Sequence, residues 1–362
     1  MANGNPQPQA KPWVTISCLL LCIGTAYYLL IQPQILFDFG FRADRPTILT
    51  ALTSLFLHQN VLHLLGNMLF LAAVGAAVEA ATGWWRFAFV YFGGGLIGVA
   101  AHWLFSIKAG SAPPLIGASG CVAACIAYYG VRYFRMQVAL APKVGASVLT
   151  LTAVWFALQI LGVFFTLPGT VGTAFWAHLG GFVGGIALSL LFKAPKDGER
   201  QLGHAVVDQM DQRSPAAKLV ATDLHLAEHP DDVQALFKKV DALATLGDKD
   251  QEGAVLLQML SKLPEVDRPP ILGRLIGIGQ VGRLPSLQRT LLAEKYRQTN
   301  PGLAKSLLLS VIGGDRKDSQ RPEALLAISA LSPNEAEPYL EELKENFPLH
   351  PATDLARTRG LI

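Results

Sequence analysis

The sequence predicts an all-α protein in two parts, a polytopic bundle of six transmembrane helices followed by a soluble α-helical domain. Three observations carry this prediction. Hydrophobic residues make up 51% of the 362 residues, and the mean hydropathy is +0.35. The apolar excess is confined to residues 13–193, whereas residues 194–362 have the composition of a soluble protein. The apolar runs are separated by short connections with Gly, Pro and the few charges.

A helix needs roughly 20 apolar residues to cross a bilayer. Six segments of the chain reach about that length. The first is longer than the apolar core of a signal peptide and has no clear cleavage motif, so we interpret it as a retained helix. The expected spans are residues 13–34, 57–80, 86–106, 115–135, 145–166 and 173–193.

Basic residues between the spans predict the orientation, because cytoplasmic connections carry an excess of Lys and Arg. One set of connections holds Lys11, Arg86, Arg132, Arg135, Lys143, Lys193 and Lys196, and the other holds only Arg42, Arg45 and Lys108. The bias predicts an integral, multi-pass membrane protein with both termini in the cytoplasm. Six spans without a transit peptide favour a bacterial inner membrane.

The remaining boundaries follow from composition. Residues 1–12 are expected to be a cytoplasmic segment, residues 194–214 a polar linker and residues 215–362 a helical domain. Turns at His229–Asp232 and Leu246–Asp248 separate helical patterns that resemble tetratricopeptide (TPR) repeats. This TPR-like domain is expected to bind a protein partner; a helical tail without a partner is the alternative. Residues 200–362 are expected to be largely dispensable for the function of residues 13–193.

Composition also excludes several kinds of partner. The formal net charge is +3 and no long basic run is present, so nucleic acid is not expected. The four cysteines form two i,i+4 pairs without further ligands at zinc-binding spacing, and we interpret them as small apolar packing residues. No cofactor and no metal is expected.

Ser119 lies in Gly117-Ala118-Ser119-Gly120 at the head of the fourth expected span. His63 and Asn67 lie early in the second span and His178 early in the sixth. With alternating topology these spans all begin at the outer face, and a rise of ~1.5 Å per residue places the polar side chains within roughly 10–15 Å of that boundary. The sequence therefore predicts one polar cluster below the membrane surface.

A serine hydroxyl is a weak nucleophile and needs a base, for which His178 is the candidate. Gly181 and Gly185 share its helix face, and small residues follow Ser119, so the two helices should approach closely. The only acidic residue in the spans, Glu79, lies near the opposite membrane face and should anchor that end of its helix. The expected machinery is a Ser119–His178 dyad.

The tetrahedral intermediate of such a reaction needs donors around its oxyanion. Asn67 and His63 are an i,i+4 pair on one helix face. Their side chains and the backbone N–H of Ser119 are the expected donors, and Gly117 permits close backbone approach. His58 and its polar neighbours indicate a hydrated opening toward the outer side.

Together these motifs resemble the rhomboid intramembrane serine proteases. The resemblance spans nearly all of residues 13–193 and rests on Thr53-Ser54-Leu55-Phe56-Leu57-His58, His63-Leu64-Leu65-Gly66-Asn67-Met68, Glu79, Gly117-Ala118-Ser119-Gly120 and Ala177-His178-Leu179-Gly180-Gly181. It implies Ser119 as nucleophile, His178 as general base, and His63 and Asn67 as oxyanion donors. It also implies single-pass transmembrane protein substrates, cut in or near a helix that unwinds easily, with a small residue before the bond.

Two positions depart from the family pattern. The aromatic residue that many rhomboids place four residues after the nucleophile is Ala123 here, and the Trp-Arg pair of the first outer loop is Leu49-Thr50. Two alternatives stay open. One is an inactive rhomboid-like scaffold that binds membrane proteins; the other is a metal-dependent enzyme or transporter that uses His58, His63 and His178.

Overall fold

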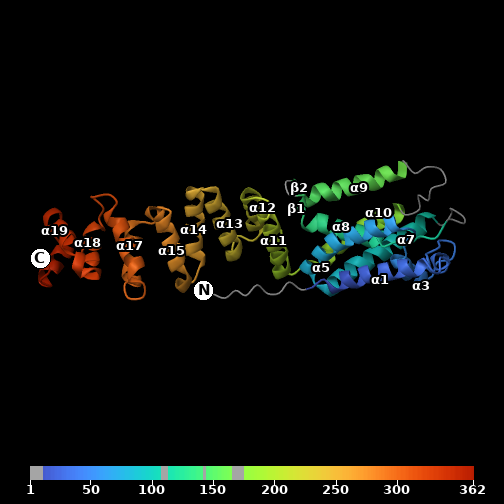
Figure 1. The fold of residues 1–362 in the computed structure, drawn as a ribbon, viewed down its shortest axis with the longest axis horizontal. Helices are drawn as coiled ribbons and strands as arrows, with labels where there is room; N and C mark the ends of the chain where they lie inside the picture. The colour runs from blue at the N-terminus through green and yellow to red at the C-terminus, as the bar shows by residue number, and fades with distance from the viewer. Residues whose placement is uncertain (1–10, 107–112, 142–143, 165–174) are drawn as a thin grey trace. The chain divides into compact units, whose positions relative to one another are not determined.

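The computed structural model describes residues 11–106, 113–141, 144–164 and 175–362. These residues are mostly α-helical and divide into two compact units, one reaching to Pro230 and the other running from Asp231 to Ile362 (Figure 1). Lys108 and Lys143, residues 1–10, and residues 165–166 and 173–174 of the expected spans lie outside the described ranges.

The unit that ends at Pro230 contains twelve α-helices within the described ranges, three short 3-10 or π turns and one hairpin. The helices are α1 (Trp13–Leu29), α2 (Ile35–Phe39), α3 (Ile48–Thr53), α4 (Val61–Phe70), α5 (Ala76–Thr82), α6 (Trp84–Ala88), α7 (Gly94–Ser106), α8 (Ser119–Arg132), α9 (Val148–Phe164), α10 (Phe175–Leu191), α11 (Lys196–Asp211) and α12 (Pro215–Glu228). The short turns are η1 (Ser54–Phe56), η2 (Leu71–Gly75) and η3 (Phe89–Gly93). Strands β1 (Gln137–Ala141) and β2 (Val144–Ser147) pair antiparallel between α8 and α9, which the sequence did not predict.

Two helices of the described residues are long and apolar enough to cross a membrane. The π turn η2 joins α4 to α5 in one helix, Val61–Thr82, and η3 joins α6 to α7 in another, Trp84–Ser106. Gly83, with φ +82°, makes the turn between them. Trp13–Leu29, Val148–Leu161 and Phe175–Leu191 are apolar but shorter, so the six-span bundle stays a prediction.

Helix α8 lies in the interior of this unit. Every residue from Gly120 to Gly130 is buried, and α8 packs against α7 and α10. Its 14 residues correspond to a length of about 21 Å, less than the ~30 Å of a hydrocarbon core. A helix this short cannot reach both surfaces of a bilayer.

Glu79 anchors α5 to the beginning of α1. Its side chain is 3% exposed and accepts hydrogen bonds from Val14 N at 2.9 Å, Thr15 N at 2.7 Å and Thr15 Oγ1 at 2.7 Å. The carboxylate thus pairs backbone donors that the first turn of a helix leaves free. The expected anchoring role of Glu79 is confirmed.

Residues 194–214 differ from the linker that the sequence predicted, because α11 occupies residues 196–211. A Cβ at Gly198 would collide with the Ala81 carbonyl oxygen, so α11 lies directly on α5. Glu199 forms an ion pair with Arg132, with 2.6 Å between Oε1 and Nη2, and ties α11 to the end of α8. This compact unit therefore continues through α11 and α12 to Pro230, and the domain boundary at residue 193 stays a prediction.

The second unit is a series of short helices, each packed mainly on its neighbours in sequence (Figure 1). They are α13 (Val233–Leu246), α14 (Lys249–Lys262), α15 (Arg268–Gly277), α16 (Ser286–Tyr296), α17 (Pro301–Ile312), α18 (Arg321–Leu331), α19 (Glu337–Asn346) and α20 (Pro351–Thr358), with 3-10 turns η5 (Glu265–Asp267), η6 (Val281–Arg283) and η7 (Pro333–Glu335). Gly247 (φ +76°) ends α13 and Asp248 caps α14, which forms a helical hairpin. Sequential packing is typical of helical repeats; the TPR-like assignment stays a prediction.

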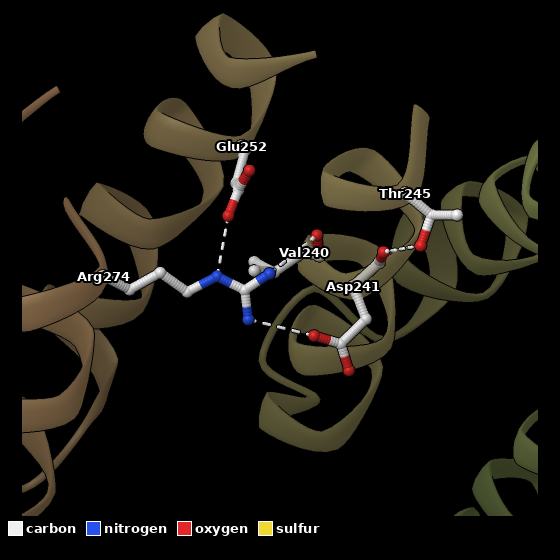
Figure 2. A network of polar contacts seen from close by, with 5 residues as sticks. All are labelled: Val240, Asp241, Thr245, Glu252 and Arg274. Carbon is white, nitrogen blue, oxygen red and sulfur yellow. Dashed lines mark hydrogen bonds and ion pairs between the residues drawn. The ribbon is translucent and has the colours of Figure 1, made fainter. Parts of the chain in front are cut away.

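Arg274 joins three helices of this unit (Figure 2). Its Nε donates to Glu252 Oε1 at 2.7 Å, and its Nη1 donates to Asp241 Oδ1 at 3.0 Å. Glu252 is 3% exposed. A buried carboxylate without a cationic partner is strongly destabilising, so this arginine fixes α15 against α13 and α14.

Candidate active site

Ser119 is the first residue of α8, four residues later than the expected start of the span at residue 115. The preceding chain is held in an extended form by Phe41, whose N–H donates to Leu115 O at 2.9 Å and whose carbonyl accepts from Leu115 N at 2.7 Å. Gly117 N then donates to Ser54 O at 2.8 Å. This backbone pairing keeps the helix from starting earlier and fixes the position of Ser119.

Gly117 is required for two separate reasons. Its φ of +122° lies in the region that favours glycine. A Cβ at this position would also lie 2.8 Å from His63 Cε1 and 3.5 Å from Ser119 Oγ. The imidazole of His63 therefore packs against the Gly117 backbone beside the Ser119 hydroxyl, and these three predicted site residues are brought together.

His63 lies in the first turn of α4. Asn60 caps that helix by accepting a hydrogen bond from the backbone N–H of His63 at 2.8 Å. The His63 ring meets the ring of His58 edge-on, with centroids 5.2 Å apart. His58 is 3% exposed, and its Nδ1 lies 3.2 Å from Phe56 O.

Helices α8 and α10 touch through their backbones. A Cβ at Gly181 would collide with Gly120 O, and one at Gly185 would collide with Ala124 O. A Cβ at Gly120 would lie 3.3 Å from Ala177 O. Ser119 precedes Gly120 and His178 follows Ala177, so the hydroxyl and the imidazole stand at the same end of this close contact, as the small residues predicted.

His178 is bonded at only one of its ring nitrogens. Its Nδ1 lies 2.7 Å from Oε1 of Gln159 in α9, whereas its Nε2 is buried without a hydrogen-bond partner. His178 Nε2 therefore makes no hydrogen bond to Ser119 in the structure. Such bonds are commonly long before a substrate binds.

Two further side-chain nitrogens near these helix starts are buried and unpaired, Nδ2 of Asn67 and Nε2 of His58. Asn67 is 7% exposed. Buried polar atoms without partners are rare in folded proteins. Asn67 Nδ2, an N–H donor, is available for a polar group that enters from outside the chain. The first backbone N–H groups of α8 add a partial positive charge beside Ser119.

Sequence reasoning missed two neighbours of His178, both on α9. Gln159 supplies the oxygen described above, and Trp155, one turn earlier, has its ring centroid 6.4 Å from that of His178. The signal was present, because a Gln within a mostly apolar helix is a polar residue that needs a hydrogen-bond partner.

A family model described as "Rhomboid domain" matches residues 45–195. The chain carries a rhomboid domain. The matched range includes Ser119, His178, His63, Asn67 and Gly117. It leaves out α1, although Glu79 within the rhomboid domain binds the start of that helix.

Three curated proteins are similar to part of this chain. "Rhomboid protease GluP" of Bacillus subtilis (strain 168) is 28% identical over 147 residues, which are 41% of this chain and 26% of that protein. "RHOMBOID-like protein 7" of Arabidopsis thaliana is 29% identical over 39% of this chain and 41% of that protein. "Rhomboid-type serine protease 2" of Emericella nidulans is 30% identical over 42% of this chain and 28% of that protein. Each similarity covers less than half of this chain and less than half of the relative.

Proposed function

We propose that this protein is an intramembrane serine endopeptidase. The observation that carries the proposal is the backbone contact of α8 with α10, which sets Ser119 and His178 at one end of two touching helices while His178 Nε2 is buried and unpaired. Two of the three relatives are named as proteases, and that similarity supports the same class of reaction here.

In the proposed reaction Ser119 Oγ attacks the scissile carbonyl carbon and its proton passes to His178 Nε2. The carbonyl oxygen becomes an oxyanion, which Asn67 Nδ2, the His63 ring and the backbone N–H of Ser119 would stabilise. Gly117 leaves the space that this arrangement needs. Collapse of the intermediate breaks the C–N bond, and His178 returns the proton to the leaving amine. A water molecule then hydrolyses the acyl-enzyme by the same route.

The short α8 supports a position of Ser119 below the membrane surface. Ser119 lies at the N-terminal end of a helix about 21 Å long, so it would sit below the surface if the other end of α8 reaches the opposite side. We propose six spans in a bacterial inner membrane, with both termini in the cytoplasm.

The proposed substrates are single-pass transmembrane proteins with a helix that unwinds easily. The second unit would recruit a protein partner.

Reconstitution in liposomes tests this function. We expect the full-length protein to cleave a labelled single-span substrate, and a fluorophosphonate to block cleavage by modifying Ser119, as mapped by mass spectrometry. A chelator should change nothing. Substrate binding with neither cleavage nor modification would identify an inactive scaffold, and loss of cleavage with the chelator would favour the metal-dependent alternative that uses His58, His63 and His178.

A pair of truncations tests where the catalytic unit ends. A chain that ends at Pro230 should cleave the generic substrate at a rate close to that of the full-length protein, because α11 and α12 are kept. A chain that ends at Glu199 is the deletion that the sequence alone predicts to stay active. It loses most of α11, which packs on α5, so from the structure we expect it to unfold at a lower temperature. Equal melting temperatures and equal rates for the two truncations would contradict the assignment of α11 to this unit.

A further inference from the structure

The orientation of the His178 ring needs a physical cause. An imidazole acts as a base through Nε2 only when its proton resides on Nδ1, and the partner of Nδ1 decides this. No carboxylate of the described residues pairs with this histidine, and its Nδ1 is hydrogen-bonded to the amide of Gln159. The residue four positions after Ser119 is Ala123, which is buried and has no ring to support the imidazole.

Helix α9 supplies the partner. Gln159 Oε1 lies 2.7 Å from His178 Nδ1, a short hydrogen-bond distance. With the amide oxygen facing the ring, Nδ1 donates and the lone pair stays on Nε2. The opposite amide orientation would put the ring proton on Nε2, where a buried donor has no acceptor, and a buried unpaired donor costs about 1–3 kcal/mol.

A second contact from α9 supports the same ring. Trp155 lies one turn before Gln159, and its ring centroid is 6.4 Å from that of His178. The same Trp155 ring stacks on Phe182 at 6.0 Å, with an angle of 10° between the planes. Trp155 and Gln159 are an i,i+4 pair on α9, and His178 and Phe182 are an i,i+4 pair on α10. The α9 pair contacts the α10 pair, and these contacts fix the relative position of the two helices at the imidazole.

We infer that Gln159 is a positioning residue, which holds His178 with its proton on Nδ1 and its lone pair on Nε2. The inference rests on the proposed hydrolysis at Ser119. When Nε2 takes the Ser119 proton, the imidazolium keeps its Nδ1–H bond to the Gln159 oxygen, which stabilises the positive charge until the proton passes to the leaving amine. In this chain α9 thus provides the ring support that the alanine at position 123 lacks.

The test uses the full-length protein in liposomes with the labelled single-span substrate, at several substrate concentrations and pH values. Gln159→Leu removes the acceptor at similar volume, and Gln159→Glu keeps an oxygen at the same reach. Leu161→Ala changes an exposed residue of the same helix and serves as the control. Thermal unfolding of each variant shows whether it folds.

For Gln159→Leu we expect kcat to fall on the order of 10- to 100-fold with unchanged KM, which is part of the 10²–10⁴-fold that a general base contributes. Gln159→Glu should retain activity, and the acid limb of its kcat/KM profile should move to higher pH by about one unit, because a carboxylate favours the protonated ring. Leu161→Ala should match the wild type.

Two results would overturn the inference: a folded Gln159→Leu protein with the wild-type kcat and pH profile, or Gln159→Glu as impaired as Gln159→Leu. The first would show that the bond has no role, and the second that an acceptor oxygen at this position is not what the imidazole requires. Failure of the proposed function looks different, because the wild-type protein would then be inactive or Ser119→Ala would cleave, and the inference would fall with it.

Discussion

Ser119→Ala and His178→Ala should each reduce the cleavage of a reconstituted single-span substrate by ~10³- to 10⁶-fold, the range seen when a nucleophile or its base is removed. Without Oγ no acyl-enzyme can form, and without Nε2 the hydroxyl has no acceptor for its proton. Substrate binding should persist, because each substitution removes only a reacting group. Single-turnover cleavage and substrate cross-linking measure the two effects separately.

The double variant and a control variant make this prediction sharper. Residues that act as one unit are not additive, so the double variant should lose no more activity than either single one. Ser189→Ala is a matched control, because Ser189 is a buried serine of α10 whose hydroxyl donates to Ile186 O. Cleavage at the wild-type rate by Ser119→Ala or by His178→Ala would mean that another group performs the chemistry.

The positions of the candidate site residues were predictable because their signals are local. Glycine beside Ser119 and polar side chains at the starts of apolar helices stand out in a single sequence, and the small residues of α8 and α10 already predicted a close approach. The anchoring role of Glu79 was predictable for the same reason. One acidic residue in an apolar helix has to find partners, and the backbone of Val14 and Thr15 provides them.

Features that depend on contacts between distant segments were not predictable. The start of α8 at Ser119 is set by the pairing of Leu115 with Phe41, more than 70 residues earlier. The apolar positions of α11 are diluted by charged neighbours, so the sequence alone predicts a linker there, whereas in the structure α11 docks on α5. The partner of His178 was missed for the same reason, since Gln159 meets the ring only after α9 and α10 pack together.

Gly181→Ala should lower kcat by about 100-fold or more and also lower the melting temperature. The added methyl group would meet the carbonyl and Cα of Gly120, and backbone atoms cannot rotate away as a side chain can. Helix α10 must then move away from α8, which separates His178 from Ser119. A misplacement of ~1 Å between reacting groups is enough for a loss of about 10²-fold, and overpacking costs about 1–3 kcal/mol of stability.

Gly24→Ala adds the same methyl group in α1, where nothing lies within 4 Å of it. Alanine favours a helix over glycine by roughly 1 kcal/mol, so helix propensity alone would make both variants more stable than the wild type. We therefore expect the melting temperature to rise in Gly24→Ala and to fall in Gly181→Ala, with activity lost only in the latter. This difference would identify disruption of the contact between α8 and α10 as the cause of both losses. A Gly181→Ala protein that is as active and as stable as Gly24→Ala would show that the two helices stand further apart in the bilayer. The close approach on which the Ser119–His178 pair depends would then be absent.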